Sequence, residues 1–300
     1  MITGKLNKSI AAGMAAVLSA LTFASCGGTS SVNDGDFNIV TSFYPMHILT
    51  MNVVGDIEGV SLSSMAQPNI GCIHDYVFST DALRMIEGAD VYVENGLGLE
   101  SFNDQILEAY PDITIVEAAS GVTDAAGEED GGYNGHVWTN LNDYILEVET
   151  VRDELSSIDP DNADRYRENA DDYIGRLQAV QTEYADVIAS LQGRKVLVLD
   201  EALPSFCIYA GIDYTAVETD HDQEALSAGV IRETIEYMNA NDIDTIFIGT
   251  ESESAGIAQT ISSETGATVY TLNTMMTGDV DPDAYIDQLT ENFVILSEMT

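Results

Sequence analysis

The stretch DPDNADRYRENADDYIGRLQAVQTEYADVIASLQ (residues 159–192) decides the fold. Asp159-Pro160 ends a preceding helical pattern, because proline cannot continue a helix. Apolar residues then recur at helical spacing from Tyr166 to Leu191, which predicts one long helix over 161–192. At about 1.5 Å per residue this helix would be roughly 45 Å long. A helix of this length predicts a rigid connection between two lobes.

Strand-like and helix-like segments alternate on both sides of this stretch. On the N-terminal side we expect strands at 37–42, 58–62, 90–93 and 113–117, and helices at 45–54, 79–89 and 140–157. On the C-terminal side we expect strands at 195–199, 214–217, 245–249 and 268–272, and helices at 203–210, 225–241, 254–265 and 283–298. Such alternation predicts mostly parallel sheets flanked by helices. The expected fold is therefore α/β, with an N-terminal lobe at 37–155, a connecting long helix at 156–194 and a C-terminal lobe at 195–300.

The N-terminal residues have the pattern of an export signal. Lys5 and Lys8 precede an uncharged apolar run that ends in LTFASC, residues 21–26. Small residues before a cysteine resemble a bacterial lipobox, which predicts a signal peptide at 1–25 and lipidation of Cys26. Residues 26–36 would then form a flexible tether. Ordinary signal cleavage or a membrane span is the alternative, although the apolar run is short for a span.

The charge balance is strongly acidic and excludes a class of partners. The chain has 51 Asp and Glu residues against 10 Lys and Arg residues, a net charge of −41. Such a surface repels nucleic acid and concentrates cations. The acidic residues are spread along the whole chain, which indicates solubility or adaptation to salt more than a dedicated site. Cys72 and Cys207 could form a disulfide in an exported protein, but two small buried side chains are the favoured interpretation.

The histidines are the first candidates for chemistry. His74 and His136 fall in loops after predicted strands, on the side where open α/β sheets bind ligands. Imidazoles suit Zn²⁺, Mn²⁺ and similar ions. His47 falls on the first predicted helix, where a packing or surface role is favoured, and His221 is a reserve ligand in a C-lobe loop.

Ordered motifs give the chain a family resemblance. It is similar to the metal solute-binding proteins of zinc and manganese ABC importers, sometimes called cluster A-I, over about residues 37–298. The motifs are TSFYP at 41–45, HDY at 74–76, VYVENGLGLE at 91–100, GHVW at 135–138, DPDNA at 159–163 and ETGA at 264–267. The resemblance implies two α/β lobes joined by one rigid helix and no enzymatic activity. It also implies a lipoprotein on the outer face of the bacterial cytoplasmic membrane.

The resemblance also implies a ligand set, which this sequence changes in the C-terminal half. His74 and His136 match the first two family ligands, and Asp200 holds the position of the third. Asn273 stands where the family has its fourth ligand, an aspartate, and Gly249 stands where the family has a glutamate. Glu201 and Asn273 are additional candidate ligands. Two imidazoles and one carboxylate suit Zn²⁺, whereas more oxygen ligands would suit Mn²⁺.

The expected function is capture of a Zn²⁺ or Mn²⁺ ion between two lobes. The partner implied is the membrane permease of an ABC importer, and we expect a monomer that binds no nucleic acid. Two alternatives stay open. One is a surface adhesion lipoprotein that keeps the fold with weakened metal binding. The other is a metal-dependent hydrolase, although the sequence has no His-Glu-x-x-His motif.

Overall fold

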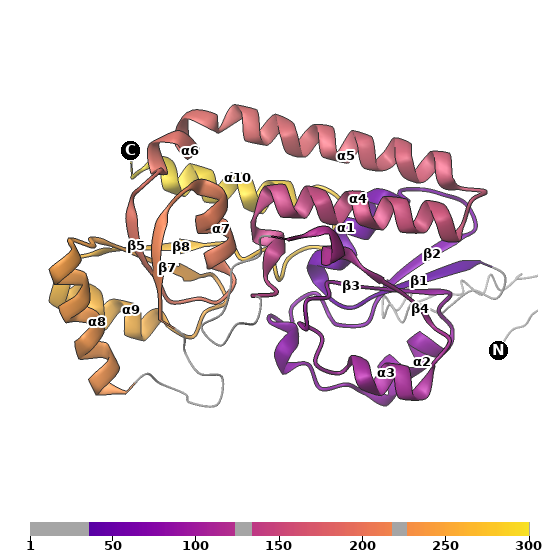
Figure 1. Ribbon diagram of the computed structural model, residues 1–300, viewed down its shortest axis with the longest axis horizontal. Coiled ribbons are helices and arrows are strands. Elements are labelled where there is room, and N and C mark those ends of the chain that lie inside the picture. The colour runs from indigo at the N-terminus through magenta and orange to yellow at the C-terminus, as the bar shows by residue number, and fades with distance from the viewer. Residues whose placement is uncertain (1–35, 124–133, 218–226, 300) are drawn as a thin grey trace, which may run out of the picture. The chain divides into compact units, whose positions relative to one another are not determined.

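The computed structural model describes residues 36–123, 134–217 and 227–299 (Figure 1). The predicted signal peptide, Cys26 and His221 lie outside the described residues, as does almost all of the predicted tether. The described residues belong to one compact unit.

Each half of the described chain contains one parallel sheet. The N-terminal sheet has the order β2-β1-β3-β4 and the C-terminal sheet the order β6-β5-β7-β8, with every pairing parallel. The N-terminal strands are β1 (Phe37–Thr41), β2 (Val60–Ser64), β3 (Val91–Glu94) and β4 (Thr114–Glu117). The C-terminal strands are β5 (Lys195–Val198), β6 (Asp213–Ala216), β7 (Thr245–Gly249) and β8 (Thr268–Leu272). The repeated order confirms the predicted α/β architecture with two lobes.

The N-terminal helices begin where the sequence provides helix-starting residues. Pro45 lies in the first turn of α1, and the hydroxyl of Ser79 caps α2 by accepting a hydrogen bond from the Ala82 N–H at 3.1 Å. The α-helices of this half are α1 (Tyr44–Val54), α2 (Thr80–Glu87), α3 (Asn103–Ala109) and α4 (Leu141–Ile158). The 3₁₀ turns are η1 (Ile73–Asp75), η2 (Ala118–Gly121) and η3 (Val137–Thr139). Helix α3 is an element that the sequence patterns did not predict.

The long connecting helix is present, with one break. Helix α5 (Ala163–Glu183) is followed by α6 (Ala185–Leu191), and Tyr184 between them has φ −101° and ψ 14°. The ring of Tyr184 stacks on Phe293 at 5.2 Å between centroids. The continuous segment α5 is therefore roughly 31 Å long, shorter than the single helix over 161–192 that the periodicity predicted. It lies over α4 and reaches α10 (Figure 1).

The C-terminal sheet is covered on both faces. Its helices are α7 (Leu203–Ala210), α8 (Ala228–Asn241), α9 (Ala255–Thr265) and α10 (Ala284–Ser297). Leu197 and Ile246 pack in a core cluster with residues of α8 and α9. Val198 and Phe247 belong to the main core, which also contains residues of α7, α10 and the N-terminal lobe. One continuous core therefore joins the two halves.

The segment 274–285, which leads into the start of α10, ties the lobes together a second time. The Trp138 indole N–H donates to the Thr274 carbonyl at 2.9 Å, and the Tyr285 hydroxyl donates to the Trp138 carbonyl at 2.7 Å. The Tyr44 hydroxyl donates to the Asp279 carbonyl at 2.9 Å. These bonds link residues more than a hundred positions apart, so the connecting helix is not the only element that fixes one lobe against the other.

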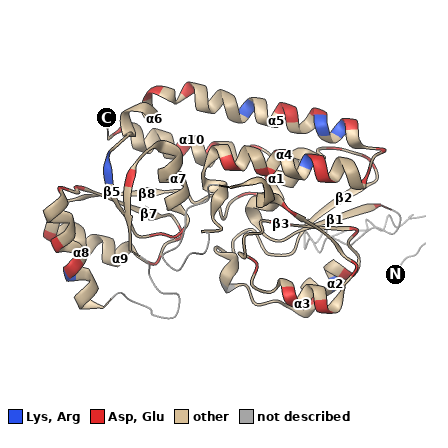
Figure 2. Cartoon of the chain, viewed as in Figure 1, with Lys and Arg blue, Asp and Glu red and all other residues tan. Residues whose placement is uncertain are grey.

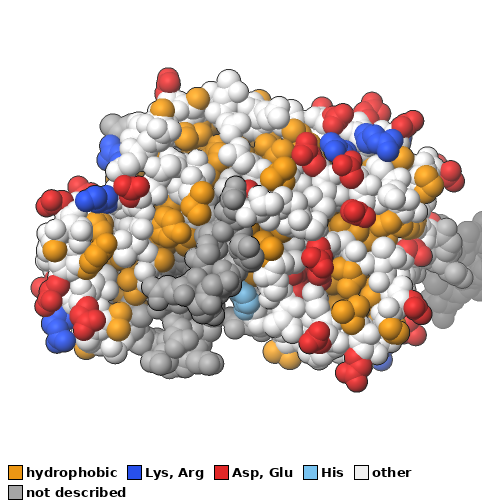
Figure 3. All heavy atoms as spheres, in the orientation of Figure 1, with side chains coloured by type: hydrophobic (Ala, Val, Ile, Leu, Met, Phe, Trp, Pro, Cys, Tyr) orange, Lys and Arg blue, Asp and Glu red, His pale blue; other side chains and the backbone are white. Residues whose placement is uncertain are grey.

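Acidic side chains are distributed over the helices of both lobes, and basic side chains accompany them on α5 (Figure 2). The space-filling view shows the same dispersal on one face of the molecule, and histidine atoms reach the surface between the lobes (Figure 3).

Candidate metal site

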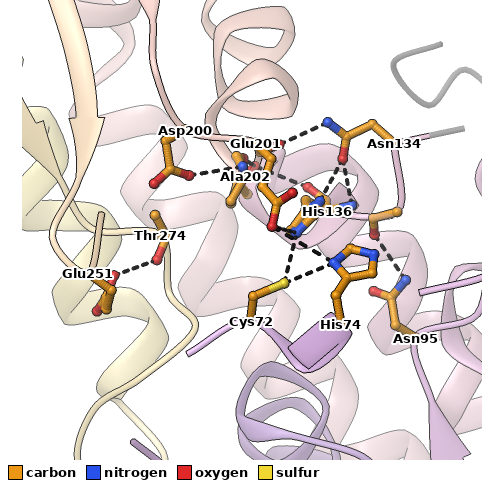
Figure 4. A network of polar contacts seen from close by, with 12 residues as sticks. Cys72, His74, Asn95, Asn134, His136, Asp200, Glu201, Ala202, Glu251 and Thr274 are labelled. Atoms are coloured by element: carbon orange, nitrogen blue, oxygen red, sulfur yellow. Dashed lines mark hydrogen bonds and ion pairs between the residues drawn. The ribbon is translucent and has the colours of Figure 1, made fainter. Parts of the chain in front are cut away.

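Four side chains from both lobes meet at one point (Figure 4). Cys72 immediately precedes η1, which follows β2 and contains His74, and His136 precedes η3. Glu201 follows β5 and comes from the C-terminal lobe. Each residue places one ligand atom in the group, and these atoms all lie within 4.8 Å of one another. The group forms because parallel strands of both sheets end toward the boundary between the lobes.

The distances within the group are short enough for one ion to bridge it. His136 Nε2 lies 3.3 Å from Glu201 Oε1 and 3.6 Å from Cys72 Sγ. His74 Nδ1 lies 3.8 Å from Glu201 Oε1 and 2.9 Å from Cys72 Sγ. Ligand atoms at about 2.0–2.3 Å from a tetrahedral Zn²⁺ ion are roughly 3.3–3.7 Å from one another. These four separations bracket that range, and all ligand atoms of the group lie within 4.8 Å of one another, so a small ion requires only modest adjustment of these side chains.

Asn134 fixes the orientation of the His136 ring. The Asn134 side-chain oxygen lies 2.8 Å from His136 Nδ1 and also accepts the His136 backbone N–H at 2.9 Å. An amide oxygen can only accept, so Nδ1–H donates to Asn134, and Nε2 is the ring nitrogen that faces the group. The ring is 3% exposed and packs against Trp138 at 5.2 Å between centroids. The surroundings of His136 therefore hold its Nε2 facing the group.

Two hydrogen bonds hold the N-terminal and C-terminal parts of the site together. The Asn134 side-chain amide donates to the Glu201 carbonyl at 2.8 Å. The Thr139 hydroxyl donates to the Ala202 carbonyl at 2.7 Å. Because these bonds join the loops that carry His136 and Glu201, both ligand atoms are held in register by the backbone.

The electrostatics of the group favour an ionised carboxylate. Burial by itself would raise the pKa of Glu201, but hydrogen bonds with His136 and His74 outweigh it and hold that pKa well below its usual range. Glu201 is 32% exposed, so it combines a stable negative charge with access from solvent. A charged oxygen beside two imidazole nitrogens is a ligand combination that suits divalent metals.

The structure places Asp200 outside this group. One Asp200 oxygen accepts the Ala202 backbone N–H at 3.0 Å, and the other occupies the space that a side chain at position 249 would need. Burial raises the pKa of Asp200. The carboxylate points toward the end of β7, away from His74 and His136 (Figure 4). The geometry therefore favours Glu201 over Asp200 as the ligand from the C-terminal lobe.

Asn273 is also outside the group. Its side-chain amide donates to Glu291 Oε2 at 3.0 Å, and its backbone N–H donates to the Asn292 side-chain oxygen at 2.7 Å. These contacts turn Asn273 toward α10. Of the five predicted ligand positions, the structure brings together His74, His136 and Glu201.

Cys72 joins the group although the sequence patterns favoured simple burial for it. The usable signal was its Cys-x-His spacing with His74. The other cysteine of the described residues, Cys207, is fully buried in α7, as expected. His47 is 8% exposed and its Nδ1 lies 3.2 Å from the Thr41 hydroxyl. Burial lowers the pKa of His47 to about 4, which fits a packing role.

The chain has two lobes, each with a parallel sheet, and a cluster of side chains that could hold a metal ion between them. This combination is the one found in two-lobed metal-binding proteins. A family model described as "Zinc-uptake complex component A periplasmic" (ZnuA) matches residues 39–299, and the chain belongs to this family.

Similar proteins bind different metals, according to their names. The manganese-binding lipoprotein MntA of Halalkalibacterium halodurans is 27% identical over 285 residues, which are 91% of this chain and 92% of that protein. The zinc-binding lipoprotein AdcA of Streptococcus pneumoniae is 28% identical over 306 residues, covering 95% of this chain. This chain spans about 60% of the length of AdcA.

Solved structures have the same fold. The structure of the SBP FpvC from Pseudomonas aeruginosa in complex with Mn²⁺ has a TM-score of 0.76 at 26% identity, and the match covers 88% of this chain and 100% of that one.

Within the described parts of the chain, no helix combines the length and apolar character needed to cross a bilayer.

Proposed function

We propose that this chain is an exported solute-binding protein that captures a transition-metal ion, Zn²⁺ or Mn²⁺, between its two lobes. The supporting observation is the convergence of His74, His136 and Glu201, whose ligand atoms lie within 4.8 Å of one another. The ion is cargo in this proposal, so the protein catalyses no reaction.

The origin of the ligands gives the capture mechanism. His74 and His136 belong to the N-terminal lobe and Glu201 to the C-terminal lobe. A bound ion therefore stabilises the pose in which the lobes are in contact. The hydrogen bonds around Trp138 and Asn134 already hold this pose, so capture requires little movement. A permease of the ABC importer class, as proposed partner, would recognise the metal-loaded form of a monomer.

The proposed location is the outer face of the bacterial cytoplasmic membrane. The sequence LTFASC at 21–26 supports lipid attachment at Cys26. The names of MntA and AdcA, both called lipoproteins, support the same location. Labelling with a radioactive fatty acid should mark the wild-type protein and leave a Cys26→Ser variant unmarked.

The metal-dependent rise in melting temperature tests the site. Protein stripped with EDTA is titrated with Zn²⁺ and separately with Mn²⁺, and the thermal midpoint is followed. A ligand at 1,000 times its Kd adds about 4 kcal/mol to the free energy of unfolding. We expect His74→Ala and His136→Ala to lose most of this increment, because each removes an imidazole from the group.

His47→Asn is the matched control, since His47 lies outside the group. This variant should lower the melting temperature of the metal-free protein but keep the metal-dependent rise. The proposed site is refuted if both site variants keep the full rise.

A further inference from the structure

The sulfur of Cys72 lies among the ligand atoms of the group and contacts both imidazoles. Its Sγ is 2.9 Å from His74 Nδ1 and 3.6 Å from His136 Nε2. It also belongs with Glu201 to the set whose ligand atoms lie within 4.8 Å of one another. Figure 4 shows the sulfur directed toward both imidazoles and the carboxylate. Cys72 as a residue is half-buried.

A thiol that only orients His74 would need contact with one ring nitrogen. Cys72 Sγ instead meets nitrogens from two separate segments, at positions 74 and 136. Both nitrogens and the Glu201 oxygen are atoms that an ion at the centre of the group would bind. The sulfur shares that centre, so the same ion would lie within bonding reach of it.

We propose that Cys72 provides a thiolate ligand, and that the cargo of this site is consequently Zn²⁺ in preference to Mn²⁺. This inference rests on the proposed function. Formation of the metal–sulfur bond breaks the S–H bond, the proton passes to solvent, and no atom is oxidised or reduced. The resulting set is one sulfur, two nitrogens and one oxygen.

The composition of this set decides between the two metals. Thiolate and imidazole ligands suit Zn²⁺, which binds four of them in a tetrahedron. Mn²⁺ prefers carboxylate, carbonyl and water oxygens, and it binds a given site of nitrogen and sulfur most weakly among the first-row divalent ions. Asp200 and Asn273, the additional oxygen ligands that would favour Mn²⁺, are turned away from the group. Among the described residues, the site therefore lacks the oxygen-rich half that manganese would need.

Cobalt substitution tests the thiolate directly, because Co²⁺ fills zinc sites and reports its ligands in its absorption spectrum. The full chain is used with Cys26→Ser, so that Cys72 and Cys207 carry its two thiols. One equivalent of Co²⁺ should give visible d–d bands together with a near-ultraviolet sulfur-to-cobalt charge-transfer band. Cys72→Ser should keep the d–d bands and lose the charge-transfer band. Cys207→Ala is the matched control and should keep both, since its thiol is fully buried in α7.

Competition titrations with Zn²⁺ and Mn²⁺ give the selectivity. We expect Cys72→Ser to weaken Zn²⁺ binding by at least about tenfold and to leave Mn²⁺ binding nearly unchanged. A charge-transfer band that persists in Cys72→Ser, or an unchanged ratio of the two affinities, would overturn the inference. Either result would leave the proposed function standing if the wild-type protein binds one equivalent of metal. A wild-type protein that binds neither Co²⁺ nor Zn²⁺ would overturn both.

Discussion

At the scale of single residues, two adjacent carboxylates are the candidate ligands from the C-terminal lobe. Asp200 and Glu201 are neighbours in sequence but point to different surroundings. Glu201 Oε1 lies 3.3 Å from His136 Nε2, whereas Asp200 accepts a backbone N–H and lies against the end of β7. The two carboxylates thus have separate surroundings, one facing the imidazoles and one packed against the end of β7.

This division predicts opposite outcomes for two isosteric changes. Glu201→Gln removes the charge that faces both imidazoles, so we expect Zn²⁺ affinity to fall by at least about tenfold. Asp200→Asn keeps a side-chain oxygen for the Ala202 N–H, so we expect Zn²⁺ affinity within about threefold of wild type. Competition with a chromophoric chelator measures both affinities. The reverse pattern, loss in Asp200→Asn alone, would return the ligand role to Asp200.

The sequence could identify the imidazoles but not the rest of the group. His74 and His136 could be proposed from their loops and motifs, because a ligand position after a strand follows from the topology of the sheet. The choice between residues 200 and 201 depends on one backbone turn. That turn is set by the Ala202 N–H and the space at position 249. Cys72 joins the group through contacts with residues 136 and 201, which are far away in the sequence, so its spacing to His74 alone could not reveal the cluster.

At the scale of elements, the end of β7 explains how Asp200 is accommodated. Gly249 pairs with Leu272 of β8 and is fully enclosed. A Cβ atom at this position would lie 2.7 Å from Thr274 Cγ2 and would overlap the Asp200 carboxylate. The absence of a side chain at Gly249, where the family has a glutamate, is therefore what leaves room for the Asp200 carboxylate at the C-terminal end of the sheet.

Gly249→Ala should consequently destabilise the C-terminal sheet. Overpacking of this kind costs about 1–3 kcal/mol in the free energy of unfolding, which urea denaturation of the metal-free protein measures. The control is Gly256→Ala in α9, where a Cβ would meet nothing within 4 Å. Alanine is the better helix former, so this control should be neutral or slightly stabilising. Equal stability of the two variants would show that the space beside Asp200 is not tightly filled.

Most elements were predictable because their patterns are local. Most strands of the described residues and the long helices have short apolar runs or helical periodicity, and these patterns arise from burial against one sheet or one core. Helix α3 has seven residues, with Ile106 as its buried side chain, so its periodicity is too short to detect. At the break, Tyr184 makes a long-range stack on Phe293. Contacts of that kind are invisible in a helical pattern, which continues through Tyr184 without interruption.

At the scale of the whole molecule, the two lobes share one core. The main cluster contains Phe43 and Tyr92 from the N-terminal lobe together with Phe206 and Phe247 from the C-terminal lobe. Tyr144 of α4 stacks on Tyr285 of α10 with centroids 3.7 Å apart. Because the burial that stabilises each lobe is continuous with that of the other, we infer that neither lobe unfolds alone.

The single tryptophan of the chain can test this continuity. Trp138 is fully buried, and its backbone and indole both bond to the segment that contains Thr274 and Tyr285. We expect its fluorescence and the far-ultraviolet circular dichroism to report one superimposable urea transition. Zn²⁺ should move both curves by the same amount, because the ion binds only the folded form with both lobes in place.

Tyr285→Phe provides the companion variant for this test. It leaves the buried Trp138 carbonyl without the hydroxyl that bonds to it, at a cost of about 1–3 kcal/mol. Both curves should then move to lower urea together, since the shared core remains. A fluorescence transition that precedes the dichroism transition, in the wild type or in this variant, would mean that the lobes separate before they unfold. Metal capture would then have to pull two independent bodies together, and the stabilisation by Zn²⁺ would appear in the fluorescence curve alone.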